Sequence, residues 1–362
     1  MLPFIQPLLH VYRYYEGKAP RGGSGEGLLR FMVKLMAGKY AIKNPHLRSK
    51  FPQALSLFIP REPRRPGQAQ LGAFHRASPD HIFKTHPLVR SSLIPALCEL
   101  YVECEFGERQ FYNKFGTRHL ISAILKYLWD LEGQRRTLVT LSEDLERFIP
   151  FLNMLGNDVV FLLDHGLDDL AAIRNEQIER ADTVQWNRQP QHTIQERNAD
   201  FRRREGGCAS MMNLANSAVN ILFYITRVIK TPFVCPEFVP RMASITLSAV
   251  DKLVGPKVSE LKVDNKAQYN FHPRSLLREI CGVIVNLSES REFLIALASE
   301  EQFYKPRNLN KALRLIRKWK MMRTNEEQQF EAMIGAVAQA YVQYNTHITL
   351  ISHSYATYIT ST

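Results

Sequence analysis

The sequence predicts an all-α protein in which amphipathic helices follow one another along the chain. Two observations support this prediction. Apolar residues in every strongly apolar segment recur at helical rather than alternating spacing, and Pro or Gly marks the turns between those segments. Each predicted helix has one apolar stripe that it cannot bury alone. We therefore expect consecutive helices to stack in pairs, with a compact multi-helix domain as the alternative.

The clearest pair of helices lies between residues 231 and 287. Pro236 opens the first helix, where a missing N–H costs nothing, and Gly255-Pro256 ends it. The apolar face of this helix comprises Val239, Met242, Ile245, Ala249 and Leu253. The second helix begins at Pro273, and its apolar side comprises Leu276, Leu277, Ile280, Val283, Ile284 and Leu287. The polar connector between them, residues 257–270, is expected to cross the surface.

The first third of the chain alternates between helical patterns and loops. Helical spacing predicts helices at residues 1–15 and 28–41, and a pair within residues 86–129. Two stretches rich in Gly, Pro and Arg have no periodicity and are predicted as flexible loops, near residues 17–27 and 60–80.

The rest of the chain continues the helical pattern. Apolar spacing predicts helices at residues 148–173, 211–229, 290–297, 308–323 and from 325 to about 344. The polar stretch before the second of these carries Arg202, Arg203 and Arg204 in a row and is predicted as a flexible loop near residues 180–207, with a solvated helix end as the alternative. The tail, residues 346–362, is rich in Thr, Ser and Tyr, and no element is predicted there.

The net charge of the chain indicates which kinds of partner it could bind. The chain of 362 residues has 47 Lys and Arg against 35 Asp and Glu, a net charge of +12. This excess favours nucleic acid, an anionic membrane or an acidic protein surface without choosing among them. Nucleic acid is disfavoured because no known nucleic-acid-binding module is recognised. Six cations lie on one predicted helix and form a candidate partner-binding face, with a solvated surface as the alternative: Lys311, Arg314, Arg317, Lys318, Lys320 and Arg323.

The five cysteines favour a reducing compartment. Their number is odd and they form no Cys-x-x-Cys pair, as expected of buried thiols in a cytoplasmic or nuclear protein. The N-terminus has no basic start or cleavage site, and no apolar run approaches the roughly 20 residues of a membrane helix, so no membrane association is expected.

No catalytic, cofactor-binding or metal-binding residue is predicted. Cys98 and Cys104 lie in apolar helical patterns without a neighbouring His motif, so burial explains them better than a nucleophilic role. His81 and His86 have no further ligand at a spacing that suits zinc. The acidic residues of the 148–173 helix suit a solvated face better than an acid–base pair: Asp164, Asp168 and Asp169.

Long irregular motifs carry a family resemblance. Residues 253–263 read LVGPKVSELKV, and residues 269–281 read YNFHPRSLLREIC. Asn44, Pro45, Leu47 and Arg48 form an Asn-Pro-x-Leu-Arg signature, and the block from His86 to Trp129 adds a His-Pro-Leu opening and a Phe-Tyr-x-Lys-Phe centre. In these motifs the chain resembles the core of the ubiquitin conjugation factors, the U-box ligase family that elongates ubiquitin chains.

The resemblance implies a fold and a function. The fold would be an irregular armadillo- or HEAT-like α-solenoid, with a core at residues 1–323 and a C-terminal helix and tail at 324–362. The function would be the scaffold of a ubiquitin-protein ligase that supports polyubiquitination for proteasomal degradation. Partners would be ubiquitin, ubiquitinated substrates, a ubiquitin-conjugating enzyme and the valosin-containing AAA ATPase, and no cofactor is needed.

The U-box is where the chain departs from that family. In the family, a C-terminal U-box holds the conjugating enzyme and so supplies the transfer activity. Residues 324–362 lack the prolines and the Asp-Pro element of such a module, so no U-box is expected there. The sequence therefore does not decide whether this chain is an enzyme. The alternative to a ligase scaffold is a non-enzymatic helical-repeat adaptor of the ubiquitin pathway.

Overall fold

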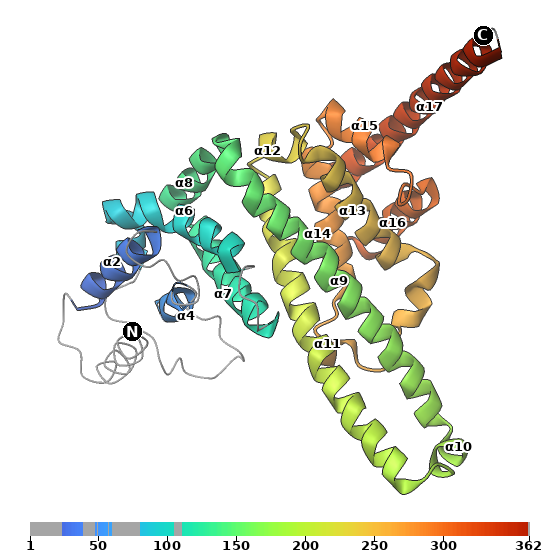
Figure 1. Ribbon diagram of the computed structural model, residues 1–362, viewed down its shortest axis with the longest axis horizontal. Coiled ribbons are helices and arrows are strands. Elements are labelled where there is room, and N and C mark those ends of the chain that lie inside the picture. The colour runs from blue at the N-terminus through green and yellow to red at the C-terminus, as the bar shows by residue number, and fades with distance from the viewer. Residues whose placement is uncertain are drawn as a thin grey trace. The chain divides into compact units, whose positions relative to one another are not determined.

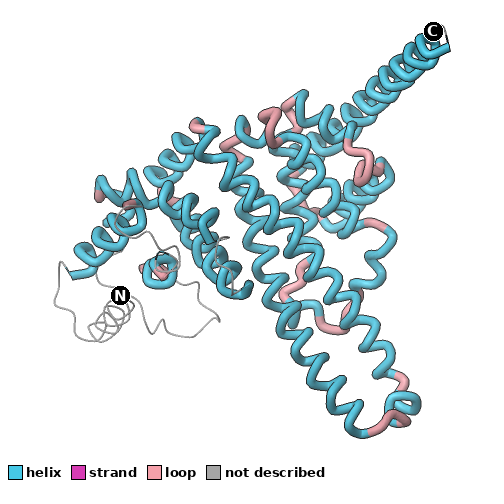
Figure 2. The backbone as a smooth tube through the Cα atoms, viewed as in Figure 1, coloured by secondary structure: helices cyan, strands magenta, loops and turns pink. Residues whose placement is uncertain are grey.

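The computed structural model describes residues 24–38, 48, 50–56, 58–59, 80–104 and 111–360. Within these ranges every regular element is a helix, which confirms the all-α prediction (Figures 1 and 2). The helix predicted at residues 1–15 and most of both N-terminal loops, 17–27 and 60–80, lie outside them. The chain divides into two compact units, residues 1–154 and 155–362.

The first unit is built around one long helix. Helix α6 (Pro87–Glu103) packs against the helices before and after it. These are α2 (Ser24–Ala37), α5 (Asp80–Thr85), α7 (Phe111–Trp129) and α8 (Glu132–Glu143), and α4 (Phe51–Leu55) packs against α2 and α7. Helix α2 begins four residues earlier than predicted, so residues 24–27 of the expected loop are helical. Helix α9 (Leu145–Ala181) starts in this unit and continues into the second.

Buried arginines connect the helices of the first unit. Arg48, which is 3% exposed, donates a 2.8 Å hydrogen bond to the backbone oxygen of Met36 and forms an ion pair with Glu103. Arg118 donates a 3.0 Å hydrogen bond to the backbone oxygen of Tyr101. Each arginine thus satisfies a helix carbonyl inside the unit, so the family-like Arg48 has a structural role here.

The second unit is a series of helices that pack against their neighbours in the chain. Its elements are α10 (Thr183–Asn187), α11 (Gln191–Thr226), α12 (Thr231–Val234), α13 (Val239–Val254), η3 (Pro256–Leu261), η4 (Lys266–Tyr269), α14 (Pro273–Leu287), α15 (Arg291–Ser299), α16 (Pro306–Trp319) and α17 (Thr324–Thr360). Helix α13 packs against α14, α15 and α16, and α17 packs against the same three helices. This stacking confirms the predicted irregular array of helical repeats.

One predicted loop of the second unit is helical instead, and so is most of the tail that was left unassigned. The stretch 180–207 is not a flexible loop, because α11 begins at Gln191 and α10 occupies most of the short gap after α9. Most of its polar residues are Arg, Gln and Glu, which are good helix formers. The one proline, Pro190, is the N-cap of α11 and so does not interrupt the helix. Residues 346–360 also continue α17, since neither Gly nor Pro interrupts them.

Helix α11 has the length and composition of a membrane-spanning helix. Its most apolar window of 18 residues has a mean hydropathy of 1.2, and no other helix in the described ranges meets this test. However, 56% of that window is buried within the protein, as in the core helix of a helical array. The finding is weak evidence for a membrane span.

Candidate interaction surface

Helix α16 separates apolar and basic residues on opposite sides. Pro306 lies in its first turn, and the left-handed Lys320 (φ 47°) ends it. The buried side consists of Asn308, Leu309, Ala312, Leu313 and Ile316. At 3.6 residues per turn, four cations fall within an arc of about 60° on the opposite side. These four, Arg307, Lys311, Arg314 and Lys318, are called the α16 strip below.

The structure divides the six cations that the sequence grouped together. Lys311, Arg314 and Lys318 belong to the α16 strip, whereas Arg317 lies on another side of the helix. Its guanidinium is held by Glu327 at 2.9 Å and Glu331 at 2.6 Å, both from α17. Lys320 is the C-cap of α16, and Arg323 directly precedes α17.

Sequence reasoning missed two cations of this surface. Arg307 stands one helical turn before Lys311, a spacing that was visible in the sequence. Arg274 comes from α14, and its guanidinium lies 3.5 Å from the centroid of the Trp319 ring. No local pattern links residues 45 positions apart. Trp319 is 45% exposed, so the strip ends in a surface aromatic ring that carries a stacked arginine.

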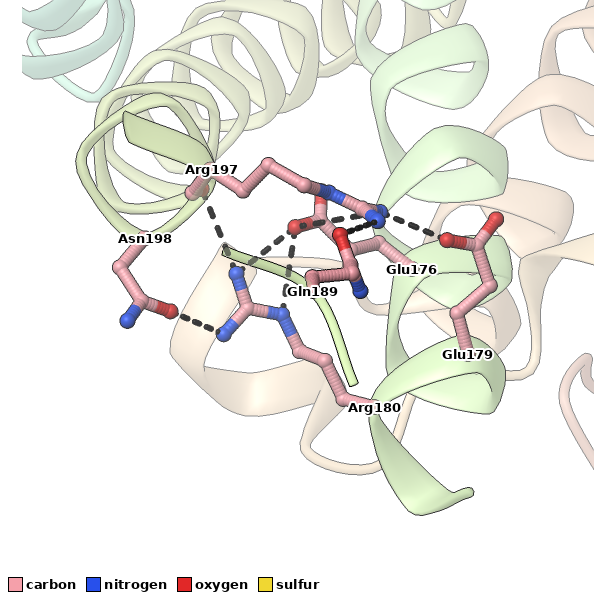
Figure 3. Close-up of polar contacts among 6 residues, drawn as sticks. All are labelled: Glu176, Glu179, Arg180, Gln189, Arg197 and Asn198. Atoms are coloured by element: carbon pink, nitrogen blue, oxygen red, sulfur yellow. Dashed lines mark hydrogen bonds and ion pairs between the residues drawn. The ribbon is translucent and has the colours of Figure 1, made fainter. Parts of the chain in front are cut away.

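A second polar cluster lies near α10, where the chain turns from α9 to α11 (Figure 1), and Figure 3 shows its polar contacts. Arg180 bonds Glu176 at 2.7 Å and Asn198 at 2.6 Å, while Arg197 bonds Glu179 at 2.6 Å and Gln189 at 3.2 Å. Both guanidinium groups also face the ring of Trp186, at 4.5 and 4.4 Å. Since these groups satisfy one another, the cluster stabilises the hairpin and leaves no reactive side chain.

Three buried cysteines have the environment of structural residues, whereas Cys104, for which burial was expected, is only partly buried. Cys98 is 3% exposed, and burial raises the pKa of its thiol far above the usual range. Burial, with the nearby carboxylates of Asp169 and Glu205, raises the pKa of Cys208 to about 12. Burial alone raises the pKa of Cys281. These three thiols stay protonated at neutral pH, so none of them is an activated nucleophile.

The acidic residues of α9 do not form a catalytic pair. Asp164 forms an ion pair with Lys252, and Asp168 is exposed. Burial raises the pKa of Asp169, whose neighbours Arg204 and His165 partly oppose that shift. In the described parts of the chain, no three His, Cys, Asp or Glu side chains gather as metal ligands would. The surface of α16 is thus the best-defined candidate for a functional contact.

Comparisons with known proteins point to one family. A family model described as the ubiquitin elongating factor core matches residues 4–338. E4 ubiquitin-protein ligase UFD2 of Saccharomyces cerevisiae is 32% identical over 313 residues, which cover 83% of this chain and 31% of the relative. Ubiquitin conjugation factor E4 A of Bos taurus is 30% identical over 305 residues, which cover 81% and 28%. The chain therefore spans about three tenths of the length of these relatives.

Proposed function

The chain belongs to the ubiquitin elongating factor core family, and from that premise we propose that it is the helical scaffold of a ubiquitin chain-elongation factor. The observation that supports this proposal is the family match, which runs from residue 4 to residue 338 and so includes most of both compact units. A scaffold of this kind supports polyubiquitination of substrates that are destined for proteasomal degradation, in the cytoplasm or nucleus.

The scaffold acts by holding reactants and not by covalent chemistry. In ubiquitin transfer, the attacking amine belongs to ubiquitin or substrate, and the thioester belongs to the conjugating enzyme. Bringing two such groups together is worth up to about 7–11 kcal/mol of the barrier. The raised thiol pKa values of Cys98, Cys208 and Cys281 argue against a covalent ubiquitin intermediate on those cysteines.

Recruitment of the conjugating enzyme falls to a module outside the described helices. Residues 324–360 form the single helix α17, so this segment is no U-box. The scaffold in our proposal binds ubiquitin and ubiquitinated substrate, and it works with a U-box, a conjugating enzyme and the valosin-containing AAA ATPase. The chain by itself is then expected to be a poor ligase.

An in-vitro chain-extension assay tests the proposal. The reaction contains activating enzyme, conjugating enzyme, ubiquitin and a mono-ubiquitinated substrate. It is run with the chain alone, a U-box alone, both as separate proteins, and a fusion of the two. We expect extension by the fusion to exceed extension by the U-box alone and by the unlinked mixture. Equal extension by the fusion and the U-box alone would contradict a scaffold role. Binding of the substrate without any gain in extension would identify a non-enzymatic adaptor.

A further inference from the structure

We propose that the α16 strip, together with Arg274 and Trp319, is a docking site for an acidic helical segment of a partner protein. The site has four cations in a row along α16 and a fifth held on the Trp319 ring at one end. This inference does not depend on the proposed scaffold function, because it concerns a peptide contact that is measured without any ubiquitination component.

The first argument is the lack of charge compensation on this surface. Several other surface cations of the second unit are paired with carboxylates, such as Arg317 with Glu327, Lys305 with Asp251, and Lys230 with Glu289. Others, such as Arg188 and Arg202, are exposed and have no ion pair among the described residues. Within the described residues, no carboxylate lies in ion-pair distance of Arg307, Lys311, Arg314, Lys318 or Arg274. Five neighbouring cations without a counter-charge make a positive surface that complements an acidic one.

The second argument is the spacing of the strip. The four cations stand at positions i, i+4, i+7 and i+11 and span about 16 Å of helix. A partner helix with Asp or Glu at the same spacing, laid against α16, places one carboxylate opposite each cation. The buried side of α16 packs into the protein, so the strip keeps its geometry whether or not a partner is bound.

The third argument is the orientation of Arg274. Its guanidinium is 3.5 Å from the centroid of the Trp319 ring, so the plane of the group is fixed by an aromatic surface. Arg278, one turn further along α14, donates a 2.9 Å hydrogen bond to the backbone oxygen of Met321 and so fixes the segment after Trp319. Arg274 is exposed and has no hydrogen-bond partner among the described residues. Its N–H groups can therefore donate to a carboxylate of the partner.

The same contact favours an acidic peptide over nucleic acid. Proteins that bind single strands stack bases on free aromatic rings. Here Arg274 covers a face of Trp319, so that face is not available to a base. The exposed part of the Trp319 ring can make an apolar contact with a Leu or aromatic residue of the partner, as in many protein interfaces.

The test is a binding measurement on the intact chain. The probe is a fluorescein-labelled peptide of roughly 18 residues, with Glu at positions i, i+4, i+7 and i+11, Leu beside the last Glu, and Ala and Gln elsewhere. Binding is followed by anisotropy between about 0.05 and 0.3 M salt. We expect saturable binding that weakens as salt rises, and no binding of a peptide with Lys at the four Glu positions.

Charge-reversal variants locate the contact. Arg314→Glu with Lys318→Glu should weaken binding by about tenfold or more. Arg188→Glu with Arg202→Glu is the matched control, because both residues are exposed, have no ion pair among the described residues and change the net charge equally. An equal loss in both double variants would mean that only net charge matters and would overturn the proposal.

Two further variants separate the stacked arginine from simple charge. Arg274→Lys keeps the charge but loses the flat guanidinium, and Trp319→Ala removes its support; each should weaken binding by about threefold or more. Circular dichroism checks that the variants are folded. The proposal fails if the peptide does not bind, or if it binds both variants as tightly as the parent chain. Tighter binding of a labelled oligonucleotide than of the peptide, lost on reversal of Arg314 and Lys318, would also overturn it.

Discussion

The Tyr269 hydroxyl donates a 2.6 Å hydrogen bond to the Glu205 carboxylate, and this contact fastens the connector between α13 and α14 to α11. Asn270 adds two more bonds to α11: its backbone oxygen accepts from Asn216 at 2.9 Å, and its side chain donates to the backbone oxygen of Ala209 at 3.1 Å. The connector is therefore a folded part of the second unit. Its family-like Tyr-Asn-Phe-His-Pro run has a structural role.

Tyr269→Phe should destabilise the second unit. The substitution keeps the ring, which is 1% exposed, and removes one of the two donors to Glu205, the other being the Gln268 amide at 3.1 Å. Loss of such a bond costs about 1–3 kcal/mol, since the remaining acceptor is partly buried. Urea unfolding followed by circular dichroism measures the change. Tyr341→Phe is the control, because Tyr341 is 40% exposed and should be almost neutral. A neutral Tyr269→Phe would show that the contact does not stabilise the fold.

Tyr269 should also make the protein sensitive to alkali. Burial and the hydrogen bond to Glu205 raise the pKa of Tyr269 above its usual 10. Above pH 10 the unfolded chain loses this proton while the folded chain keeps it. The unfolded state then binds fewer protons, and the free energy of unfolding falls as pH rises. The decline above pH 10 should be shallower in Tyr269→Phe than in the parent chain, and parallel curves would contradict this assignment.

Gly282 allows α14 to approach α11 closely. A Cβ atom at this position would lie 2.4 Å from the ring of Phe223. Gly282→Ala should therefore cost about 1–3 kcal/mol through overpacking. Gly206→Ala is the matched control, since nothing lies within 4 Å of a Cβ there. An alanine in that exposed helical position should stabilise by about 0.5–1 kcal/mol. Thermal unfolding shows whether each variant is more or less stable than the parent chain. A stabilising Gly282→Ala would refute the close packing.

The cysteines of the core should resist alkylation. Cys98 and Cys281 are buried and their thiol pKa values are raised. The reagent therefore cannot reach the sulfur atoms, and the reactive thiolate form is not populated. Native protein treated with iodoacetamide at pH 8 should stay unmodified at both sites, while protein in guanidinium chloride should react at both. Peptide mass spectrometry resolves the individual cysteines. Rapid native modification of Cys98 would reopen the question of a covalent ubiquitin intermediate.

Some helix ends with clear chemical signals could be predicted from the sequence. The start of α13 was not one of them, because it was predicted at Pro236 and lies at Val239, with Pro240 in the first turn. The predicted start at Pro273 and end at Leu287 are the bounds of α14, because proline opens the helix and the apolar residues keep a regular spacing. Helix α8 was missed. Two of its four buried residues, Gln134 and Ser142, are polar, and their burial depends on bonds such as that from Gln134 to the backbone oxygen of Phe83. Such bonds join distant segments, and local periodicity does not report them.

The candidate surface was predictable only as a basic helix. The spacing of Lys311, Arg314 and Lys318 was visible in the sequence. The neutralisation of Arg317 depends on where α17 docks, and the stacking of Arg274 on Trp319 depends on the packing of α14 beside α16. Both are tertiary contacts between side chains that no local pattern connects. Whether the surface binds a partner stays a prediction.

Arg48 offers the sharpest test of a structural against a recognition role for the Asn-Pro-x-Leu-Arg signature. Arg48→Met removes the hydrogen bond to Met36 and leaves Glu103, which is 23% exposed, without its cation. Loss of one partner of a buried ion pair costs about 3–5 kcal/mol, and the partial exposure of Glu103 favours the lower end. The double variant Arg48→Met with Glu103→Gln should recover part of that loss, because the unpaired carboxylate is gone.

The control for this pair is Arg136→Met. Arg136 and Glu132 form an ion pair one helical turn apart on α8, with side chains 75% and 66% exposed. Such exposed pairs contribute about 0.3–0.5 kcal/mol. Urea unfolding should therefore separate the two arginines clearly. If Arg48→Met were as stable as Arg136→Met, the ion pair with Glu103 would not hold the first unit together, and Arg48 would have to be explained by a contact with another molecule.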